Sequence, residues 1–446
     1  MINLPLKSTD KLIFALAIPM ILSNITVPLL GLVDTAVIGH LSHAYYLGGS
    51  SVGAMIITFI TWLCGFLRMS TTGLSAQALG SEDTDKALQV LVRGLLVAFA
   101  IGVTLILLQA PYLDIALYLA GGSDQVQHYA RQYAEIRVWG LPAALANIVL
   151  LGWLLGQHKA KAVMWLLIFT NSVNLILDLV FVLVFDWKVA GVAWATLIAE
   201  YSSLIVGLVV VSHIIRRASH SLTVSSLMSL AKDLAGLGQY FKLNRDILIR
   251  TLCLEICFVF ITFQGARLGD NVVAANAILL NFLLLISFGL DGIANAAEAL
   301  VGKAHGKKDT LHVQQIVRRS LLWTVVFAAG YSLLFTLLGN SFVGLMSSID
   351  EVVNVAQQFL PWIYLLPLIS CWCYLYDGIY IGLTRADIMR NSMVLSTFGI
   401  FFPLWWIFST FGNHGLWLAF SGFMLSRGLT LGWYYYCRGA GKAIAV

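Results

Sequence analysis

The sequence predicts an all-α integral membrane protein with twelve transmembrane helices. Of its 446 residues, 59% are hydrophobic and only 11% are charged, and the mean hydropathy is +0.85. A soluble domain carries roughly 25% charged residues, so lipid must cover much of this chain. Runs such as 90–108 and 163–185 are nearly free of charge and long enough to span a bilayer as a helix. The short alternating segments of a transmembrane β-barrel do not occur in the sequence.

Glycines, prolines and clusters of charge divide the apolar sequence into segments. Each segment is predicted to be helical, because every backbone polar group in lipid must be paired internally. The first segment follows Lys7 and Lys11, is too long for a signal-peptide core and lacks a small-residue cleavage site, so we expect it to remain as a span. In chain order, the predicted spans are 12–39, 51–79, 87–109, 126–155, 160–184, 189–214, 246–267, 272–303, 312–338, 352–384, 388–411 and 414–438.

The basic residues of the loops fall almost entirely on one side of the membrane. The opposite loops hold only Lys188 and Arg267. By the positive-inside rule, both termini are cytoplasmic and the number of spans is even. The net charge of +5 therefore reports topology, and we expect no nucleic-acid partner. The basic residues of the inner side are Lys7, Lys11, Lys86, Lys159, Lys161, Arg216, Arg217, Lys232, Lys242, Arg245, Lys303, Lys307, Lys308, Arg385, Arg390, Arg438 and Lys442.

The chain is predicted to consist of two similar halves. Six spans lie on each side of the longest loop, so we expect an N-lobe over 1–215, a cytoplasmic linker over 216–245 and a C-lobe over 246–446. Six spans per half make the repeat parallel, a plan found among secondary transporters. Short matches recur about 225 residues apart, namely 80–83 with 306–309, Arg93 with Arg319, Pro142 with Pro367, and 191–194 with 415–418.

Several polar residues of the N-lobe fall within predicted spans at one depth. A charge at mid-bilayer costs at least about 2.5–3.5 kcal/mol, so such residues usually mark function or a buried pair. Asp34, Asp178 and Thr196 each fall roughly 9–11 Å below the outer end of their spans, at a rise of about 1.5 Å per residue. Asn174 lies one helical turn before Asp178, and Asn171 shares that helix face. The spacing predicts one polar site.

The residue types leave three roles open for this site. It could be a structural hydrogen-bond network, a site for a desolvated cation such as Na⁺, or a proton acceptor. Burial raises the pKa of a carboxylate by up to about 3–5 units, and a second carboxylate nearby raises one of the pair further. Glu200, four residues after Thr196, is a candidate member of the same network.

The first predicted span contains two prolines. Pro19 and Pro28 each remove a helix hydrogen bond and favour a kink. Proline is common in membrane helices, so both have an ordinary interpretation. The alternative is a hinge at Pro28 whose bend depends on the protonation of Asp34, six residues further on.

The second half carries its acidic residues at other positions. Glu255 lies in the seventh predicted span, Asp291 and Glu298 in the eighth, and Asp377 in the tenth. The carboxylates of the N-lobe have no counterparts at the repeat-related positions, so we expect the two lobes to differ in role.

Motifs of enzymes and ATP-driven pumps are missing from the sequence. It contains no Walker loop, and His40, His43, His128 and His158 fall at helix ends or in loops without the spacing of a metal site. The six cysteines lie in apolar segments or at a helix end, and we interpret them as packing residues. We therefore expect neither an enzyme nor a metal site.

Seven segments together resemble a known family. They include GLVDTAVIGH at 31–40 and AQALG at 76–80, and the full set is 19–40, 76–80, 171–178, 191–196, 267–270, 299–302 and 376–382. In order and spacing they resemble the multidrug and toxic compound extrusion (MATE) transporters, in particular the DinF-like branch. The resemblance covers nearly the whole chain.

The resemblance implies two six-helix lobes around a central cleft, and export of small cationic amphiphilic drugs in exchange for H⁺ or Na⁺. Asp34, Asn174, Asp178 and Thr196 match the family's N-lobe cation site, and the C-lobe acids Glu255 and Asp377 approximately match positions of the NorM-like branch. It implies a monomer without cofactor in the cell inner membrane, surrounded by lipid.

The alternative function is a lipid-linked oligosaccharide flippase of the related superfamily. Such a flippase would want basic residues lining its cavity, to hold pyrophosphate. The excess of embedded charge in this sequence is interpreted as acidic, which favours cations. Between the coupling ions we favour H⁺, because Na⁺ needs a cage of oxygen ligands and few are evident.

Overall fold

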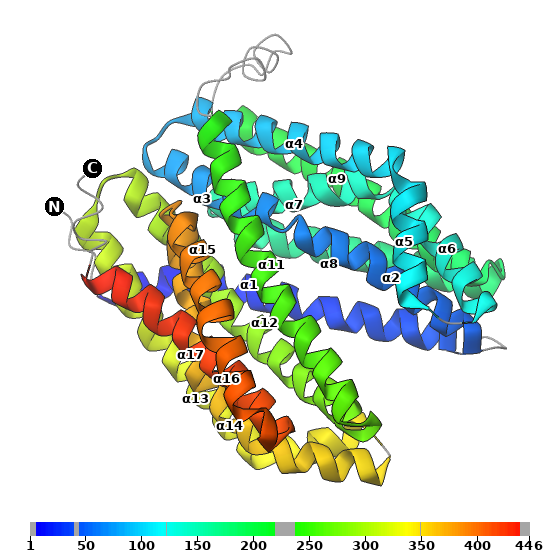
Figure 1. Ribbon diagram of the computed structural model, residues 1–446. Helices are drawn as coiled ribbons and strands as arrows, with labels where there is room; N and C mark the ends of the chain where they lie inside the picture. The colour runs from blue at the N-terminus through cyan, green and yellow to red at the C-terminus, as the bar shows by residue number, and fades with distance from the viewer. Residues whose placement is uncertain (1–5, 40–43, 122, 219–236, 348, 438–446) are drawn as a thin grey trace. The chain divides into compact units, whose positions relative to one another are not determined.

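The computed structural model describes the chain except residues 1–5, 40–43, 122, 219–236, 348 and 438–446, and the side chains of 27–39 also lie outside the description. The described residues are almost entirely helical and contain no strand (Figure 1). They divide into two compact units. The amino-terminal unit is Leu22–Leu237, and the carboxy-terminal unit is Met1–Ile21 together with Gly238–Val446.

The first long helix, α1, is shared by the two units, and the rest of the amino-terminal unit is formed by the helices up to α9. Packing joins α2 to α6, α3 and α4 to α7, and α8 to α9. The bounds are α1 Leu6–Gly39, α2 Ala44–Leu63, α3 Phe66–Gly80, α4 Thr84–Leu107, α5 Gln109–Ala120, α6 Asp124–Val138, α7 Leu141–Gly156, α8 Ala160–Asp178, η1 Leu179–Val184 and α9 Lys188–Ala218.

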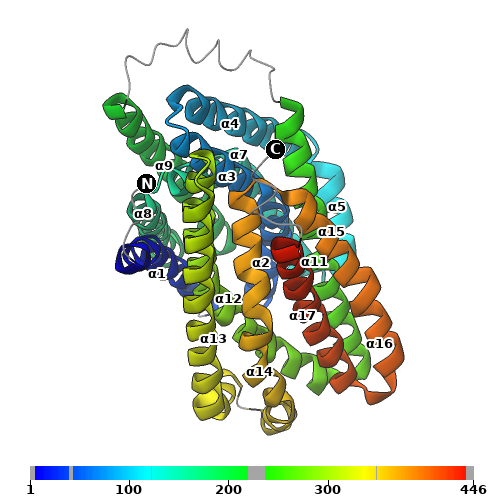
Figure 2. The same cartoon turned by 90° about the vertical axis from the view of Figure 1, so that its left-hand side faces the viewer.

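The carboxy-terminal unit is formed by the helices from α11 onward. Helices α12, α13 and α14 pack side by side, and α17 packs against α14 (Figure 2). The bounds are α11 Leu237–Leu268, α12 Asp270–Gly306, α13 Thr310–Met346, α14 Asp350–Gly382, α15 Ala386–Val394, η2 Leu395–Phe401, α16 Phe402–Phe408, η3 Ser409–Phe411 and α17 Asn413–Cys437.

The predicted fold class is confirmed. Each of the twelve predicted spans falls on a helical stretch of the described chain, although some stretches are broken, such as α2 with α3 and α6 with α7. Helix α5 was not predicted, because residues 110–125 fall in the loop between two predicted spans. Only its Leu113 and Leu117, one turn apart, are buried. The N-lobe, linker and C-lobe boundaries remain a prediction, and most of the linker lies outside the described residues.

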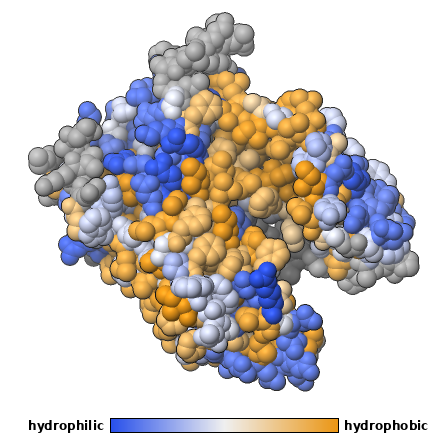
Figure 3. Space-filling model, viewed as in Figure 1, coloured by the Kyte–Doolittle hydropathy of each residue, from blue (hydrophilic) through white to orange (hydrophobic). Residues whose placement is uncertain are grey.

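The surface of these helices is suited to lipid. Nine helices of the described chain are long and apolar enough to cross a membrane, and the bent pair α6 and α7 provides a tenth. Large apolar side chains such as Leu337 and Trp406 are 71% and 81% exposed. In Figure 3, hydrophobic residues cover much of the visible surface along the helices, and hydrophilic residues gather near helix ends. The predicted spans in α11 and α17 are less apolar, and both contain buried arginines.

Helix α1 passes from one unit to the other just after Pro19. Its first half is held by α12 and α13: Phe14 packs edge-on against Trp323 at 4.6 Å between ring centroids, and the Trp323 indole donates to Asp10 Oδ1 at 3.1 Å. Ile21 lies so close to Gly292 that a Cβ there would meet it at 2.2 Å. The unit boundary follows Ile21, two residues after Pro19.

Backbone geometry supports the internal repeat. Glu82 and Lys308 both adopt φ of 58°, in the turns before α4 and α13. His158 and Thr384 form a second pair, with φ of 60° and 53°. Positive φ is uncommon for residues other than glycine, so two matched pairs with one sequence offset are not expected by chance. The aspartates after the first pair, Asp83 and Asp309, both cap the next helix.

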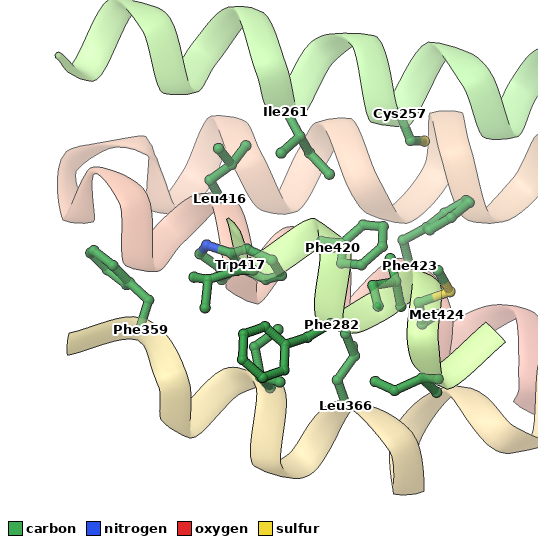
Figure 4. Packing of buried hydrophobic residues seen from close by; sticks show 14 of the residues in the cluster. Cys257, Ile261, Phe282, Phe359, Leu366, Leu416, Trp417, Phe420, Phe423 and Met424 are labelled. Carbon is green, nitrogen blue, oxygen red and sulfur yellow. The ribbon is translucent and has the colours of Figure 1, made fainter. Parts of the chain in front are cut away.

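Aromatic side chains fill the core of the carboxy-terminal unit. Phe282 of α12 packs edge-on against Phe335 of α13 at 5.1 Å, and Trp417 packs against Phe420 on α17 at 6.0 Å. Figure 4 shows Phe282, Trp417, Phe420 and Phe423 gathered between the surrounding helices. All four are nearly inaccessible. Helices α14 and α17, which carry buried charges, pack against each other beside this core.

Replacing Gly378 by valine should destabilise the carboxy-terminal unit. A Cβ at Gly378 would lie 2.4 Å from the carbonyl oxygen of Ala294, so α12 and α14 would have to separate. We expect the free energy of unfolding to fall by about 1–3 kcal/mol or more, which lowers the thermal unfolding midpoint of the purified protein. Gly330→Val is the control, because Gly330 has open space around it. An unchanged midpoint for Gly378→Val would show that the two helices do not pack this closely.

Candidate functional site

Helix α8 carries the polar residues predicted for the site on the face that meets α9. The two helices pack along their lengths, and Thr170 Oγ1 of α8 donates to Ser203 Oγ of α9 at 2.8 Å. Further along the same face, Asn174 is 1% exposed and Asp178 is fully buried. Burial of an ionisable side chain at a helix–helix contact requires hydrogen-bond partners.

Asn174 links Asp178 to Thr196 of α9. One amide atom of Asn174 lies 2.8 Å from Asp178 Oδ2, and the other lies 2.8 Å from Thr196 Oγ1 and 3.1 Å from its backbone nitrogen. Thr196 Oγ1 also lies 3.0 Å from the carbonyl oxygen of Val192. The structure thus brings together three of the four residues predicted for the cation site.

The Asn174 amide has two possible orientations at this site. With Asp178 ionised, Asn174 Nδ2 donates to Asp178 Oδ2 and Asn174 Oδ1 accepts from Thr196. With the amide turned over, Nδ2 donates to Thr196 Oγ1, which donates onward to Val192, and Oδ1 faces Asp178 Oδ2. The second arrangement lets a protonated Asp178 donate to Asn174 Oδ1, but it places Asn174 Nδ2 3.1 Å from the backbone nitrogen of Thr196, where two donors face each other. The first arrangement is therefore the better satisfied one. A carboxylate accepts only, whereas a carboxylic acid also donates.

The backbone changes directly after Asp178. Helix α8 ends at Asp178 and continues as the π-helical segment η1, Leu179–Val184. Single-turn π segments inside helices are rare and often lie at functional sites. The repeat-related eleventh predicted span also contains a π-helical segment, η2, at Leu395–Phe401. The carboxylate therefore sits where the helix departs from regular hydrogen bonding.

The two residues suggested as further network members have partners of their own. Asn171 Nδ2 donates to Thr26 Oγ1 of α1 at 2.8 Å, which fastens α8 to the second half of α1. Glu200 of α9 accepts from Arg137 at the end of α6, at 2.7 and 2.8 Å. The Glu200 carboxylate is thus held in a two-point ion pair, and we assign it to the α6–α9 contact.

The remaining N-lobe candidates lie on α1. The helix is continuous through Pro19 and Pro28. Pro19 is buried. The side chains of Pro28 and Asp34 lie outside the described residues, so the hinge role and the pairing of Asp34 with Asp178 remain predictions.

The carboxy-terminal candidates have surroundings that the sequence did not predict. Asp377 of α14 accepts through Oδ2 from Arg250 of α11 and from Arg427 of α17, the latter at 2.8 Å. Asp377 was expected to be an acidic candidate for a cation site, but its carboxylate is neutralised by two guanidinium groups. Glu255 is half-buried on α11 and interacts electrostatically with Arg250.

The sequence did not indicate the partners of three buried arginines. Arg137, Arg250 and Arg427 all lie within predicted spans and are buried. Their positions in apolar segments were the signal available, but their partners lie on other helices and could not be assigned from spacing. The expected acidic excess in the membrane is therefore offset by basic residues at these points.

Comparisons with known proteins agree on one family. The MatE family model matches residues 19–180 and 247–407. DNA damage-inducible protein F of Escherichia coli is 43% identical over 429 residues, covering 96% of this chain and 92% of that protein. The probable multidrug resistance protein NorM of Rhizobium meliloti is 24% identical over 410 residues, covering 87% of this chain and 86% of its own length. An outward-facing MATE family transporter of known structure has 18% identity and a TM-score of 0.86, covering 98% and 97% of the two chains.

Proposed function

Because this chain belongs to the MatE family of membrane transporters, we propose that it is a secondary active antiporter that exports cationic amphiphilic drugs in exchange for H⁺. The observation that carries the proposal is the fully buried Asp178, whose carboxylate accepts a hydrogen bond from Asn174, which in turn accepts from Thr196. A group that changes its protonation in a dry site can couple proton movement to a change of state.

The register of α1 and α8 supports a role for Asp34 in the same site. Thr26 of α1 and Asn171 of α8 are in hydrogen-bond contact. Both helices are odd-numbered predicted spans and run in the same direction. At about 1.5 Å per residue, positions 34 and 178 lie about 12 and 10.5 Å further along, so the two residues reach nearly the same depth. A second carboxylate at that depth would raise the proton affinity of the pair.

The proposed cycle exchanges one charge for another. In the ionised state, the site attracts a drug cation, and Asn174 donates to Asp178. A proton entering from outside neutralises the ionised carboxylate of Asp178, turns the Asn174 amide over, and removes the attraction, so that the drug leaves outward. Helix α1 bends in the step, with Pro28 or Pro19 as the hinge. Exchange of one proton for one monovalent cation moves no net charge, so the pH difference alone would drive it.

The hydrogen bonds favour H⁺ over Na⁺ as the coupling ion. In the ionised arrangement, the described partner of Asp178 Oδ2 is an amide N–H of Asn174, which a cation would have to displace. Hard metal cations require several oxygen ligands at once. A proton needs only the carboxylate oxygen and an acceptor, and Asn174 Oδ1 supplies the acceptor when the amide turns over.

The coupling ion can be tested in liposomes that contain the purified protein and a fluorescent cationic dye. An imposed pH gradient should drive dye movement, and an imposed Na⁺ gradient at constant pH should not. The control is a set of liposomes without protein under the same gradients. Dye movement driven by Na⁺ alone would replace H⁺ by Na⁺ in the proposal, and no movement under either gradient would contradict antiport of cationic drugs.

A lipid-linked oligosaccharide flippase remains the second candidate because Arg250 and Arg427 are basic residues buried within predicted spans. A lipid translocation assay in the same liposomes separates the two functions. Translocation of a pyrophosphate-linked lipid without dye export would favour the flippase.

A further inference from the structure

The carboxy-terminal unit contains two arginines that meet at a single carboxylate oxygen. Arg250 of α11 and Arg427 of α17 both donate through Nη2 to Oδ2 of Asp377 on α14. The Arg427 side chain is 2% exposed, that of Arg250 11% and that of Asp377 9%. Three helices that are separate in sequence therefore bury two positive groups around one negative group.

These two guanidinium groups keep donors that Asp377 does not use. A guanidinium presents five N–H donors in a planar fork that suits two acceptor oxygens at once. Within the part of the chain that the structure describes, Nε of Arg250 and Nε of Arg427 are buried without a hydrogen-bond partner. Arg427 Nη1 contacts the sulfur of Met424 at 3.3 Å, and a thioether is a weak acceptor. Each fork thus has donors available for an oxyanion.

The charge balance in the immediate contact is positive. Two guanidinium groups face one carboxylate, and an uncompensated buried charge is strongly unfavourable. Other acidic groups nearby include Glu255, which interacts electrostatically with Arg250, and Asp291 of α12, whose charge acts at longer range on Cys373 of α14. They reduce the positive field. Among the described residues, Asp377 is the acid that accepts hydrogen bonds from both arginines.

We propose that Arg250 and Arg427 form a binding site for an anionic head group, a carboxylate or a phosphate, and that Asp377 competes with this ligand for the two guanidinium groups. A bound oxyanion accepts hydrogen bonds from the guanidinium N–H groups that Asp377 does not use. Its negative charge then helps Asp377 to balance the two arginines. The site is separate from the Asp178 cluster, and its test requires no transport.

Anion binding can be measured as a rise in the thermal unfolding midpoint of the detergent-purified protein. Inorganic phosphate and acetate are titrated at constant ionic strength against chloride. We expect stabilisation of the wild type, and an apparent affinity about tenfold higher for Asp377→Asn, because that change removes the competing charge and keeps both arginines. Arg427→Met should abolish the stabilisation. Arg131→Met is the matched control, because Arg131 pairs with Asp114 on the exposed surface of the other unit.

Two further measurements distinguish a soluble anion from an anionic amphiphile and from a lipid head group. One adds decyl phosphate, with decyltrimethylammonium as the cationic control, and the other compares nanodiscs of phosphatidylglycerol with nanodiscs of phosphatidylcholine. Stabilisation by inorganic phosphate alone supports a soluble anion. Stabilisation restricted to decyl phosphate supports an amphiphile, and stabilisation restricted to phosphatidylglycerol supports a lipid head group.

Two results would overturn the proposal. One is the lack of any anion-dependent shift in the wild type in every arm. The other is a shift of equal size in Arg427→Met. If Asp377→Asn does not fold, Arg427→Lys replaces it: it keeps the charge, loses the fork, and should bind the anion more weakly than the wild type.

Discussion

Replacing Asp178 by asparagine is expected to abolish proton-driven drug efflux while leaving the protein folded. Asparagine keeps the shape of the side chain, and its amide can still hydrogen-bond to Asn174, but it can neither bind nor release a proton. In liposomes with an imposed pH gradient, we expect the efflux rate to fall at least about tenfold, to the leak of empty liposomes.

The control for this variant is Asp186→Asn. Asp186 is exposed in the turn that follows η1, eight residues from Asp178, so the same chemical change there should leave efflux unchanged. Thermal unfolding of both variants shows whether they are folded. Wild-type efflux by a folded Asp178→Asn protein would remove Asp178 from the coupling mechanism and leave its hydrogen bonds with a structural role.

Replacing Asp377 by leucine is expected to be the most destabilising change in the carboxy-terminal unit. Arg250 and Arg427 would then be buried without their shared carboxylate. Removing one partner of a buried ionic cluster costs about 3–5 kcal/mol, because the remaining charge is uncompensated. We expect a much lower unfolding midpoint and poor recovery of monodisperse protein from membranes.

The control for Asp377→Leu restores the charge balance in another way. A triple variant, Arg250→Met, Asp377→Leu and Arg427→Met, replaces the whole cluster by apolar side chains of similar size, and should recover most of the lost stability. If Asp377→Leu unfolds at the wild-type temperature, the three charged groups do not form the buried cluster described here.

The sequence predicted the helices well because lipid imposes strict rules on them. A charge-poor segment of sufficient length must be helical, and loop charges report the side of the membrane. These rules did not identify helix α5, because its polar residues and proline suggest a loop. In the structure, only its Leu113 and Leu117 are buried. Helices α11 and α17 were predicted as spans, but the pairing of their arginines was not, because the shared partner Asp377 lies on a third helix, α14.

The site was predictable to the extent that it is local. Asn174 and Asp178 are one turn apart on α8, so their common face follows from helix geometry. Matching depth was enough to place Thr196 of α9 in the same group, and in the structure Thr196 Oγ1 lies 2.8 Å from the Asn174 amide. The ion pairs of Glu200 with Arg137 and of Asp377 with Arg250 and Arg427 depend on how distant helices pack, which spacing within a helix does not determine.

Proton release on drug binding tests the antiport proposal most directly. Tetraphenylphosphonium is added to the purified protein in weakly buffered detergent that contains a pH-sensitive dye. If drug cation and proton compete for the buried carboxylates, the wild type should release about one proton per bound cation, by linkage, and Asp178→Asn should release markedly less. Drug binding without proton release, or equal release by Asp178→Asn, would contradict the claim that this carboxylate exchanges a proton for the drug.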